Sequence, residues 1–306
     1  SRGASGSARF PSRRSFIRGP LKTYFSSHLK ERHMLHDEEQ HFLIAMGNNL
    51  RTKFRYLAER TPGMEVHTLG DMQYVNSQRA SYTFNTIFGQ PSSPDEIHAI
   101  THYYHEKNYP AVWWIIPSES THHAEHLLCQ AKWSFDQLAV GMYFPMEKFV
   151  APPISQFLTI KECQSPADYQ AFGEVLASIF DDSQPLEAES ARVVYQKMST
   201  LPKSMIPDLD LFIGYEGAEP VATAAAFFTQ DIGGIFNITT RPDKRKRGYG
   251  TALFYTALTR IKERGAIFSI LEALPDGLAL YEHEGFKPFG TVQGWNNRKI
   301  LRPQHL

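Results

Sequence analysis

The sequence lacks several features that would assign a protein to a common class. Only two of its 306 residues are cysteines, Cys129 and Cys163, so it has no disulfide framework, as is typical of a reducing compartment. The 32 Lys and Arg residues balance the 32 Asp and Glu residues, so the net charge gives no reason to expect a nucleic-acid partner. No apolar run approaches the roughly 18 residues of a membrane span. The composition therefore predicts a cytoplasmic protein with neither a membrane span nor a nucleic-acid partner.

Acidic residues are also missing from residues 1–30, which contain seven Lys or Arg residues and many serines. The first acidic residue is Glu31. A basic tail, a targeting segment and a vector-derived leader would all have this composition. We interpret residues 1–30 as a flexible basic tail.

The loop at residues 245–250, with the pattern R-x-x-G-x-G, carries the strongest functional signal. A β-branched apolar run at 235–240 precedes it, and a run with helical periodicity follows it, with apolar residues at Leu253, Ala257 and Ile261. Glycine permits positive φ and a close approach of the backbone to a ligand. The first N–H groups of a helix are unpaired and attract anions. Strand, basic glycine-rich turn and helix together predict a phosphate-binding site.

Two familiar phosphate sites do not fit this loop. A Walker loop requires Lys after its last glycine, and here Thr251 follows Gly250. A dinucleotide fingerprint requires a third glycine, and that position is Leu253. The pyrophosphate of coenzyme A remains as the third alternative.

A second pattern lies about thirty residues downstream. Residues 266–273 form an apolar run of strand length, and residues 275–277 follow it as a break. A short helical stretch with Tyr281 follows, and then Gly285 and Phe286 open another strand.

Together, the two patterns resemble the GNAT N-acyltransferase superfamily, whose first signature matches residues 238–250 and whose second matches residues 266–286. The resemblance implies an α/β fold with a mixed sheet. Residues 151–306 would then be a catalytic GNAT domain. Residues 31–150 repeat its order of strands and helices without the phosphate loop, so we interpret them as a degenerate first copy of a tandem. The boundary would fall near Pro152 and Pro153.

The resemblance also implies roles for individual residues. Tyr281 matches the family's general acid, and its phenol stays protonated at neutral pH. The strand residues and the loop residues would bind acetyl-CoA as co-substrate, without a metal, for transfer to the amine of a small molecule or a peptide. These cofactor-binding residues are Ile238, Thr239, Thr240, Arg245, Lys246, Arg247, Gly248, Tyr249, Gly250 and Thr251.

The general base is less clear from the sequence. Asn237 occupies the inward position of the motif strand and cannot accept a proton, whereas Glu272 could act directly or through water. Asp231 is a poorer choice. A chain without a dedicated base is a further alternative, and so is a non-catalytic CoA-binding or interaction scaffold with the same fold.

Two other groups of residues carry weaker predictions. His102, His105, His122, His123 and His126 lie one helical turn apart in two clusters, but no carboxylate stands at metal-ligand spacing, so we predict exposed helical histidines. The acidic segment 181–207, which includes Asp181, Asp182, Glu187 and Glu189, is a candidate to face a cationic acceptor, and a solvated helix face is the simpler alternative.

Overall fold

The computed structural model describes residues 38–116, 121–153 and 158–302, so the predicted tail at 1–30 lies outside the described residues. Contacts group residues 42–306 into one compact unit. The strands of this unit form a single mixed sheet in the order β1-β2-β3-β4-β11-β5-β10-β9-β8-β7-β6. The strands are β1 (Glu65–Leu69), β2 (Met72–Asn76), β3 (Thr86–Phe88), β4 (Val112–Ile115), β5 (Ser134–Pro145), β6 (Thr159–Glu162), β7 (Leu209–Glu216), β8 (Glu219–Thr229), β9 (Ile232–Thr240), β10 (Phe268–Ala273) and β11 (Lys287–Asn296).

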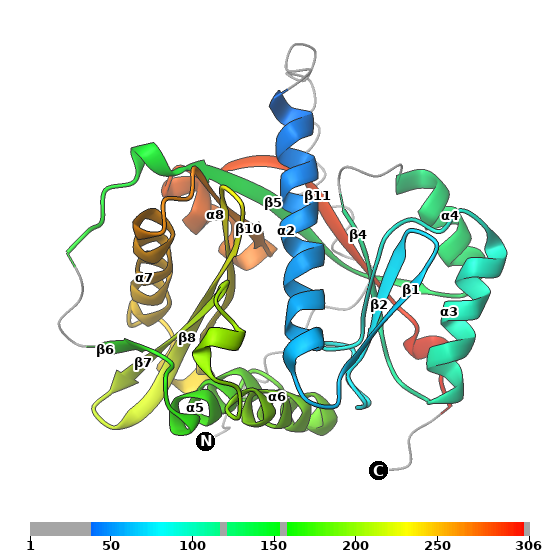
Figure 1. Ribbon diagram of the computed structural model, residues 1–306, viewed down its shortest axis with the longest axis horizontal. Helices are drawn as coiled ribbons and strands as arrows, with labels where there is room; N and C mark the ends of the chain where they lie inside the picture. Colours follow the sequence, from blue (N-terminus) through cyan, green and yellow to red (C-terminus); the bar gives the residue numbers. More distant parts are fainter. Residues whose placement is uncertain (1–37, 117–120, 154–157, 303–306) are drawn as a thin grey trace, which may run out of the picture. The chain divides into compact units, whose positions relative to one another are not determined.

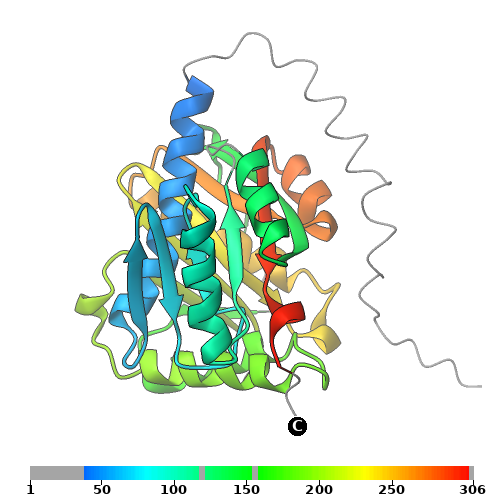
Figure 2. The same ribbon diagram turned by 90° about the vertical axis from the view of Figure 1, so that its right-hand side faces the viewer.

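Helices cover both faces of this sheet (Figures 1 and 2). They are α2 (Glu38–Arg60), α3 (Pro94–Glu106), α4 (Thr121–Gln130), α5 (Pro166–Ala177), α6 (Pro185–Met198), α7 (Tyr249–Glu263) and α8 (Pro275–His283). Helix α5 starts after Ser165, where Ser165 and Asp168 form a capping box with Pro166 at the first helical position. In the first half, α3 and α4 pack on one face of the sheet and α2 packs on the other.

The final strands of the two halves are exchanged in the middle of the sheet (Figure 1). β5 of the first half lies between β10 and β11, the last two strands of the second half, and is antiparallel to both. Reciprocally, β11 lies between β4 and β5 and is antiparallel to both. The mixed α/β sheet expected from the sequence is therefore confirmed. The division into 31–150 and 151–306 remains a description of the sequence, because the halves share one sheet.

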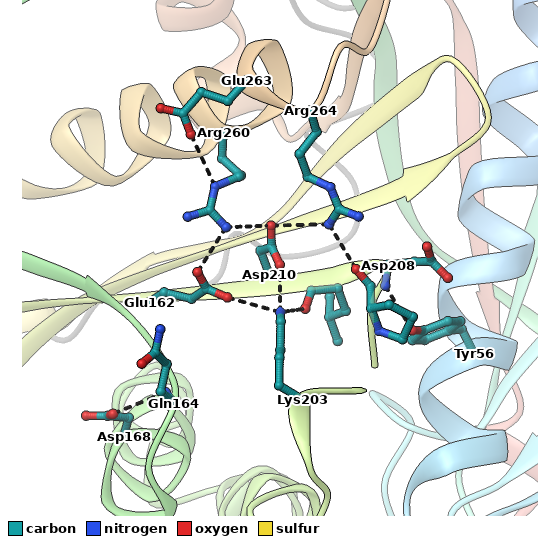
Figure 3. A network of polar contacts seen from close by, with 12 residues as sticks. Tyr56, Glu162, Gln164, Asp168, Lys203, Asp208, Asp210, Arg260, Glu263 and Arg264 are labelled. Carbon is teal, nitrogen blue, oxygen red and sulfur yellow. Dashed lines mark hydrogen bonds and ion pairs between the residues drawn. The ribbon is translucent and has the colours of Figure 1, made fainter. Parts of the chain in front are cut away.

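A network of buried and half-buried charges secures the C-terminal end of α7 (Figure 3). The carboxylate of Asp210, almost fully buried on β7, lies 2.6 Å from Lys203, 2.8 Å from Arg260 and 3.3 Å from Arg264. Glu162 on β6 adds a second carboxylate, 3.1 Å from Lys203 and 2.9 Å from Arg260. This network fixes α7 against β6 and β7, and thereby fixes the direction of the opposite end of the helix, where the phosphate loop lies.

Candidate active site

β9 and β10 separate where the resemblance placed the acyl site. Their parallel pairing covers three register pairs, from Ile232–Phe268 to Gly234–Ile270. Beyond that point β9 runs on to Thr240 and β10 to Ala273, and within these two fully described strands no further pairing joins them. The facing backbone groups of the two strands are thus left for another partner. We call this opening the strand gap.

A β-bulge shapes the strand gap from the β9 side. Thr223 pairs with Thr239 and Ala225 with Phe236, so β9 carries one residue more than β8 over this stretch. The bulge contains Asn237 at φ +53, and its carbonyl accepts a 2.8 Å hydrogen bond from the Thr223 hydroxyl. The bulge at Asn237 therefore bends β9 locally beside the gap. The sequence identified this residue as unable to act as a base but did not reveal the bulge.

The phosphate loop has the backbone of an anion site. Gly248 is the N-cap of α7 at φ +80, and no side chain caps the helix, so the first N–H groups of α7 stay open. At Gly250, an added Cβ would come within 3.1 Å of the Thr240 hydroxyl oxygen. Only glycine fits that position without displacing its neighbour, because the helix start lies directly against the end of β9.

The four cations of the loop are not equivalent. Lys244 lies 2.5 Å from Glu216 and 2.7 Å from Glu219, and Arg247 lies 2.9 Å from Glu216. Hydrogen bonds from Lys244 and then from Tyr249 hold the pKa of Glu216 at about 2, so the carboxylate stays charged. Arg245 and Lys246 have no carboxylate partner among the described residues, and Arg245 donates only to the Thr240 carbonyl. Of the three cations that the resemblance assigned to the cofactor, Arg245 and Lys246 thus remain for a ligand, whereas Arg247 pairs with Glu216.

Tyr281 lies on α8, on the α7 side of the sheet. Its half-buried ring contacts Phe254 of α7 at a centroid distance of 5.4 Å and Phe286 at 6.2 Å. Burial raises the pKa of Tyr281 further above its ordinary value, so its hydroxyl is protonated at neutral pH. Within the described residues this hydroxyl makes no hydrogen bond, which leaves its proton available to a ligand.

Glu272 projects from the opposite face of the sheet. It has the same orientation on β10 as Ile270, which packs against Met46 and Leu50 of α2. Burial raises the pKa of Glu272 to about 7, and the positive charge of Lys53 partly offsets this effect. A carboxyl group with this pKa can accept a proton near neutral pH. Asp231 lies in the turn before β9, at the closed end of the strand pair, so it stays outside the gap.

Lys53 is a site residue that sequence reasoning missed. It lies on α2, more than two hundred residues from Glu272, with its Nζ 4.1 Å from the ring centroid of Phe54 and 4.9 Å from that of Phe236. Burial lowers its pKa to about 8, while the charge of Glu272 acts in the opposite direction. No local motif marks this lysine, because its role depends on where α2 crosses the sheet.

The acidic segment 181–207 divides into two parts. Asp181, Asp182 and Glu189 line a cavity of about 590 Å³ at the α5–α6 helix pair. Glu187 does not face an acceptor: its buried carboxylate accepts hydrogen bonds from the Ser81 hydroxyl at 2.6 Å and the Tyr82 amide at 2.8 Å. For Glu187 the expectation was wrong, since this residue ties the second half to a loop of the first.

The first half has neither a strand gap nor an uncapped helix start like that of α7. β3 pairs with β4 along all three of its residues, so no gap opens there. At the start of α3, the carboxylate of Glu96 accepts hydrogen bonds from the Ser92 amide at 2.6 Å and the Ser92 hydroxyl at 2.8 Å. The Ser93 side chain accepts a hydrogen bond from the Glu96 amide, so the start of α3 is capped by the chain's own side chain.

The described residues contain neither a metal site nor a membrane-spanning helix. Among the described residues, no group of three or more His, Cys, Asp or Glu side chains could hold a metal ion. In the same part of the chain, none of the helices combines the length and the apolar character needed to cross a bilayer.

Comparisons with known proteins agree with this geometry. Residues 175–286 match the model of the acetyltransferase (GNAT) family. None of the curated proteins matches the sequence.

Solved structures extend the likeness to most of the chain. A GCN5-related N-acetyltransferase from Kribbella flavida is 14% identical, with a TM-score of 0.58 over 82% of this chain and 95% of that one. Another from Sphaerobacter thermophilus is 15% identical, with a TM-score of 0.56 over 77% and 79%. A tandem GNAT protein from the clavulanic acid biosynthesis pathway is 10% identical, with a TM-score of 0.53 over 88% and 97%. The chain therefore carries an acetyltransferase (GNAT) domain at residues 175–286 and has the GNAT fold in a tandem form.

Proposed function

We propose that the chain is a CoA-dependent N-acyltransferase that transfers an acetyl group from acetyl-CoA directly to a primary amine. The observation that carries this proposal is the strand gap beside the uncapped start of α7. An extended amide-bearing chain can bind between the separated strands while its phosphates bind the helix N-terminus.

The residues present fit coenzyme A. The N–H groups of Tyr249, Gly250 and Thr251 at the start of α7, together with Gly248, would hold the pyrophosphate. Arg245 and Lys246 would add positive charge, whereas Lys244 and Arg247 serve mainly to keep the loop in place through Glu216. Backbone groups of Ile238, Thr239 and Thr240, on the open edge of β9, would pair with the amides of the pantetheine arm.

One side chain on each face of the sheet would carry out one of the two proton transfers. When bound, the thioester supplies an activated acyl carbonyl. Tyr281, protonated on the α7 side, donates a proton to the departing sulfur. Glu272, on the α2 side, accepts a proton from the incoming ammonium, directly or through water. Backbone N–H groups of β9 stabilise the negative charge on the carbonyl oxygen.

Each chain would bind one molecule of CoA, because the first half has neither the strand gap nor the uncapped helix start of the second half. The Ser93 side chain caps the helix start of the first half, and β3 and β4 do not separate. A non-catalytic CoA-binding scaffold is the second candidate function. It shares the loop and the gap but has no need for Tyr281 or Glu272.

The variant Tyr281→Phe separates these two functions. We expect it to lower kcat by about 10²–10⁴-fold, because the general acid is removed, while CoA affinity measured by calorimetry stays unchanged. Thiol release with a panel of primary amines reports the turnover. Wild-type protein that binds CoA but acetylates no amine would support the scaffold.

The loop assignment has its own test. The double variant Arg245→Glu with Lys246→Glu should weaken CoA binding about a hundredfold, since two charge-assisted contacts are lost. Lys299→Glu, which reverses an exposed charge outside the loop, is the matched control and should leave CoA binding unchanged. Equal CoA affinity of the double variant and the control would refute the site.

A further inference from the structure

The α2 side of the strand gap has a defined set of side chains. Gly234 and Ile270 are the last paired residues, so Phe236 and Glu272, each two positions further, face one another across the gap on the α2 side. Lys53 and Phe54 of α2 lie over this opening, with the Lys53 Nζ 4.9 Å from the Phe236 ring centroid. One cation, one carboxylate and two phenyl rings therefore meet where an acceptor would approach the acyl group.

Neither charge at this opening has a hydrogen-bonded partner. Within the described residues, Lys53 and Glu272 form no hydrogen bond or ion pair, and Lys53 contacts aromatic faces. Burial shifts the pKa of each group toward its neutral form, to about 8 for Lys53 and about 7 for Glu272. Both side chains are half-buried, and a partly desolvated charge without a hydrogen-bonded partner is less stable than one in water, so this arrangement suits a ligand that brings both complementary charges.

We propose that the acceptor is a small amino acid, whose carboxylate binds Lys53 of the first half while its amine faces Glu272 and its aliphatic part packs on Phe54 and Phe236. The inference rests on the proposed acyl transfer. It gives the first half a defined role, because α2 then supplies the residue that selects the acceptor.

The transfer balances with these groups alone. The ammonium gives one proton to Glu272, the neutral nitrogen forms the C–N bond to the acyl carbon, and the C–S bond breaks. The sulfur takes a proton from Tyr281, and the second proton of the nitrogen restores that phenol. The products are an N-acetylated amino acid, the free thiol of CoA and one proton released to solvent from Glu272.

The test compares acceptors that differ only in the carboxylate. Acetylation by the full chain is measured with amino acids, their amides and the corresponding decarboxylated amines, with acetyl-CoA saturating. We expect kcat/KM to favour the amino acids by about 10- to 100-fold in the wild type, as expected for one charge-assisted contact. Lys53→Met should remove this preference, chiefly through KM, and Lys53→Arg should retain most of it. Arg55→Met is the matched control: this arginine is exposed on the same helix and pairs only with Glu59, so the preference should stay.

Each unexpected result of this experiment would overturn a different claim. Acetylation of all three acceptor types with equal kcat/KM would overturn the acceptor assignment and leave the acyltransferase function standing. An unchanged preference in Lys53→Met, with a melting temperature near that of the wild type, would overturn the role of Lys53. Absence of transfer to any amine, with CoA still bound, would overturn the proposed function and this inference with it.

Discussion

At the residue scale, the proposed chemistry depends on Glu272, whose half-buried side chain lies at the opening beneath α2. Burial raises its pKa to about 7, and the charge of Lys53 limits that rise. The group therefore changes protonation near neutral pH, where a base for an ammonium is most useful. Burial raises the pKa of Tyr281, so this phenol keeps its proton. Above about pH 7 the two groups thus have opposite protonation states.

The pH dependence of catalysis should reveal Glu272. We expect kcat/KM to rise with pH through about 7 as this carboxyl loses its proton. Glu272→Gln should abolish that limb, and Lys53→Met should move it to higher pH, because the lysine charge lowers the pKa of Glu272. Rate profiles with a single acceptor keep the titration of the acceptor amine constant among the variants. A limb near pH 7 that persists in Glu272→Gln would assign it to another group.

The sequence predicted only part of this site. Tyr281 and Glu272 could be placed because they lie within a strand–helix pattern that is local in the chain. Lys53 could not, since its approach to Phe236 depends on how α2 crosses the sheet.

The loop cations show the same limit of sequence reasoning. Arg245, Lys246 and Arg247 all lie within the motif, and the resemblance implied that all three bind the cofactor. In the structure, Glu216 pairs with Lys244 and Arg247 and leaves Arg245 and Lys246 for a ligand. The division depends on a carboxylate from β7, about thirty residues earlier in the chain, which no pattern in the loop reveals.

At the element scale, α7 connects a charged network at one end with the phosphate loop at the other. Asp210 on β7 pairs with Lys203, Arg260 and Arg264 (Figure 3). Burial alone would raise the pKa of Asp210, but hydrogen bonds from Lys203 and Arg260 outweigh it, and the pKa is lowered. The carboxylate therefore stabilises the fold wherever it is ionised.

Asp210→Asn should destabilise the protein by about 1–3 kcal/mol, because three partly buried cations lose their shared buried carboxylate while Glu162 still pairs with Lys203 and Arg260. Since the folded pKa lies below the unfolded value, this stabilisation is present above about pH 4 and is lost as pH falls further. Chemical denaturation as a function of pH measures both effects.

Glu174→Gln is the control for Asp210→Asn, because it removes an exposed carboxylate that pairs with Arg192 at 2.9 Å. An exposed pair contributes roughly 0–1 kcal/mol. If the two variants unfold at the same denaturant concentration, the network does not hold α7.

At the scale of the whole molecule, the two halves complete one another. Each inserts its last strand between the last two strands of the other. The chain end adds further contacts with the first half: the Asn297 side chain accepts a 2.8 Å hydrogen bond from the Ala111 amide and donates one of 3.1 Å to the Tyr109 carbonyl. The acyl site therefore depends on residues from both halves.

Neither half should fold alone. In residues 151–306 without β5, strands β10 and β11 would stand two strand spacings apart, roughly 9–10 Å, with unpaired edges between them. We expect this fragment to lack a cooperative thermal transition and to aggregate. Co-expression with residues 42–150 should restore a soluble complex that binds CoA. A monomeric fragment 151–306 that melts cooperatively and binds CoA would show that the second half does not need strand β5 of the first half.

The sequence by itself determined the local units: the strand, glycine turn and helix of the phosphate loop, the helix starts, and the motif that carries Tyr281. These follow from backbone preferences and side-chain periodicity, which act over a few neighbouring residues. Only the tertiary structure decided which half supplies the strand beside β10, which loop cations pair with Glu216, and that Lys53 meets Glu272. These depend on contacts between segments that are distant in the chain, which no local pattern encodes.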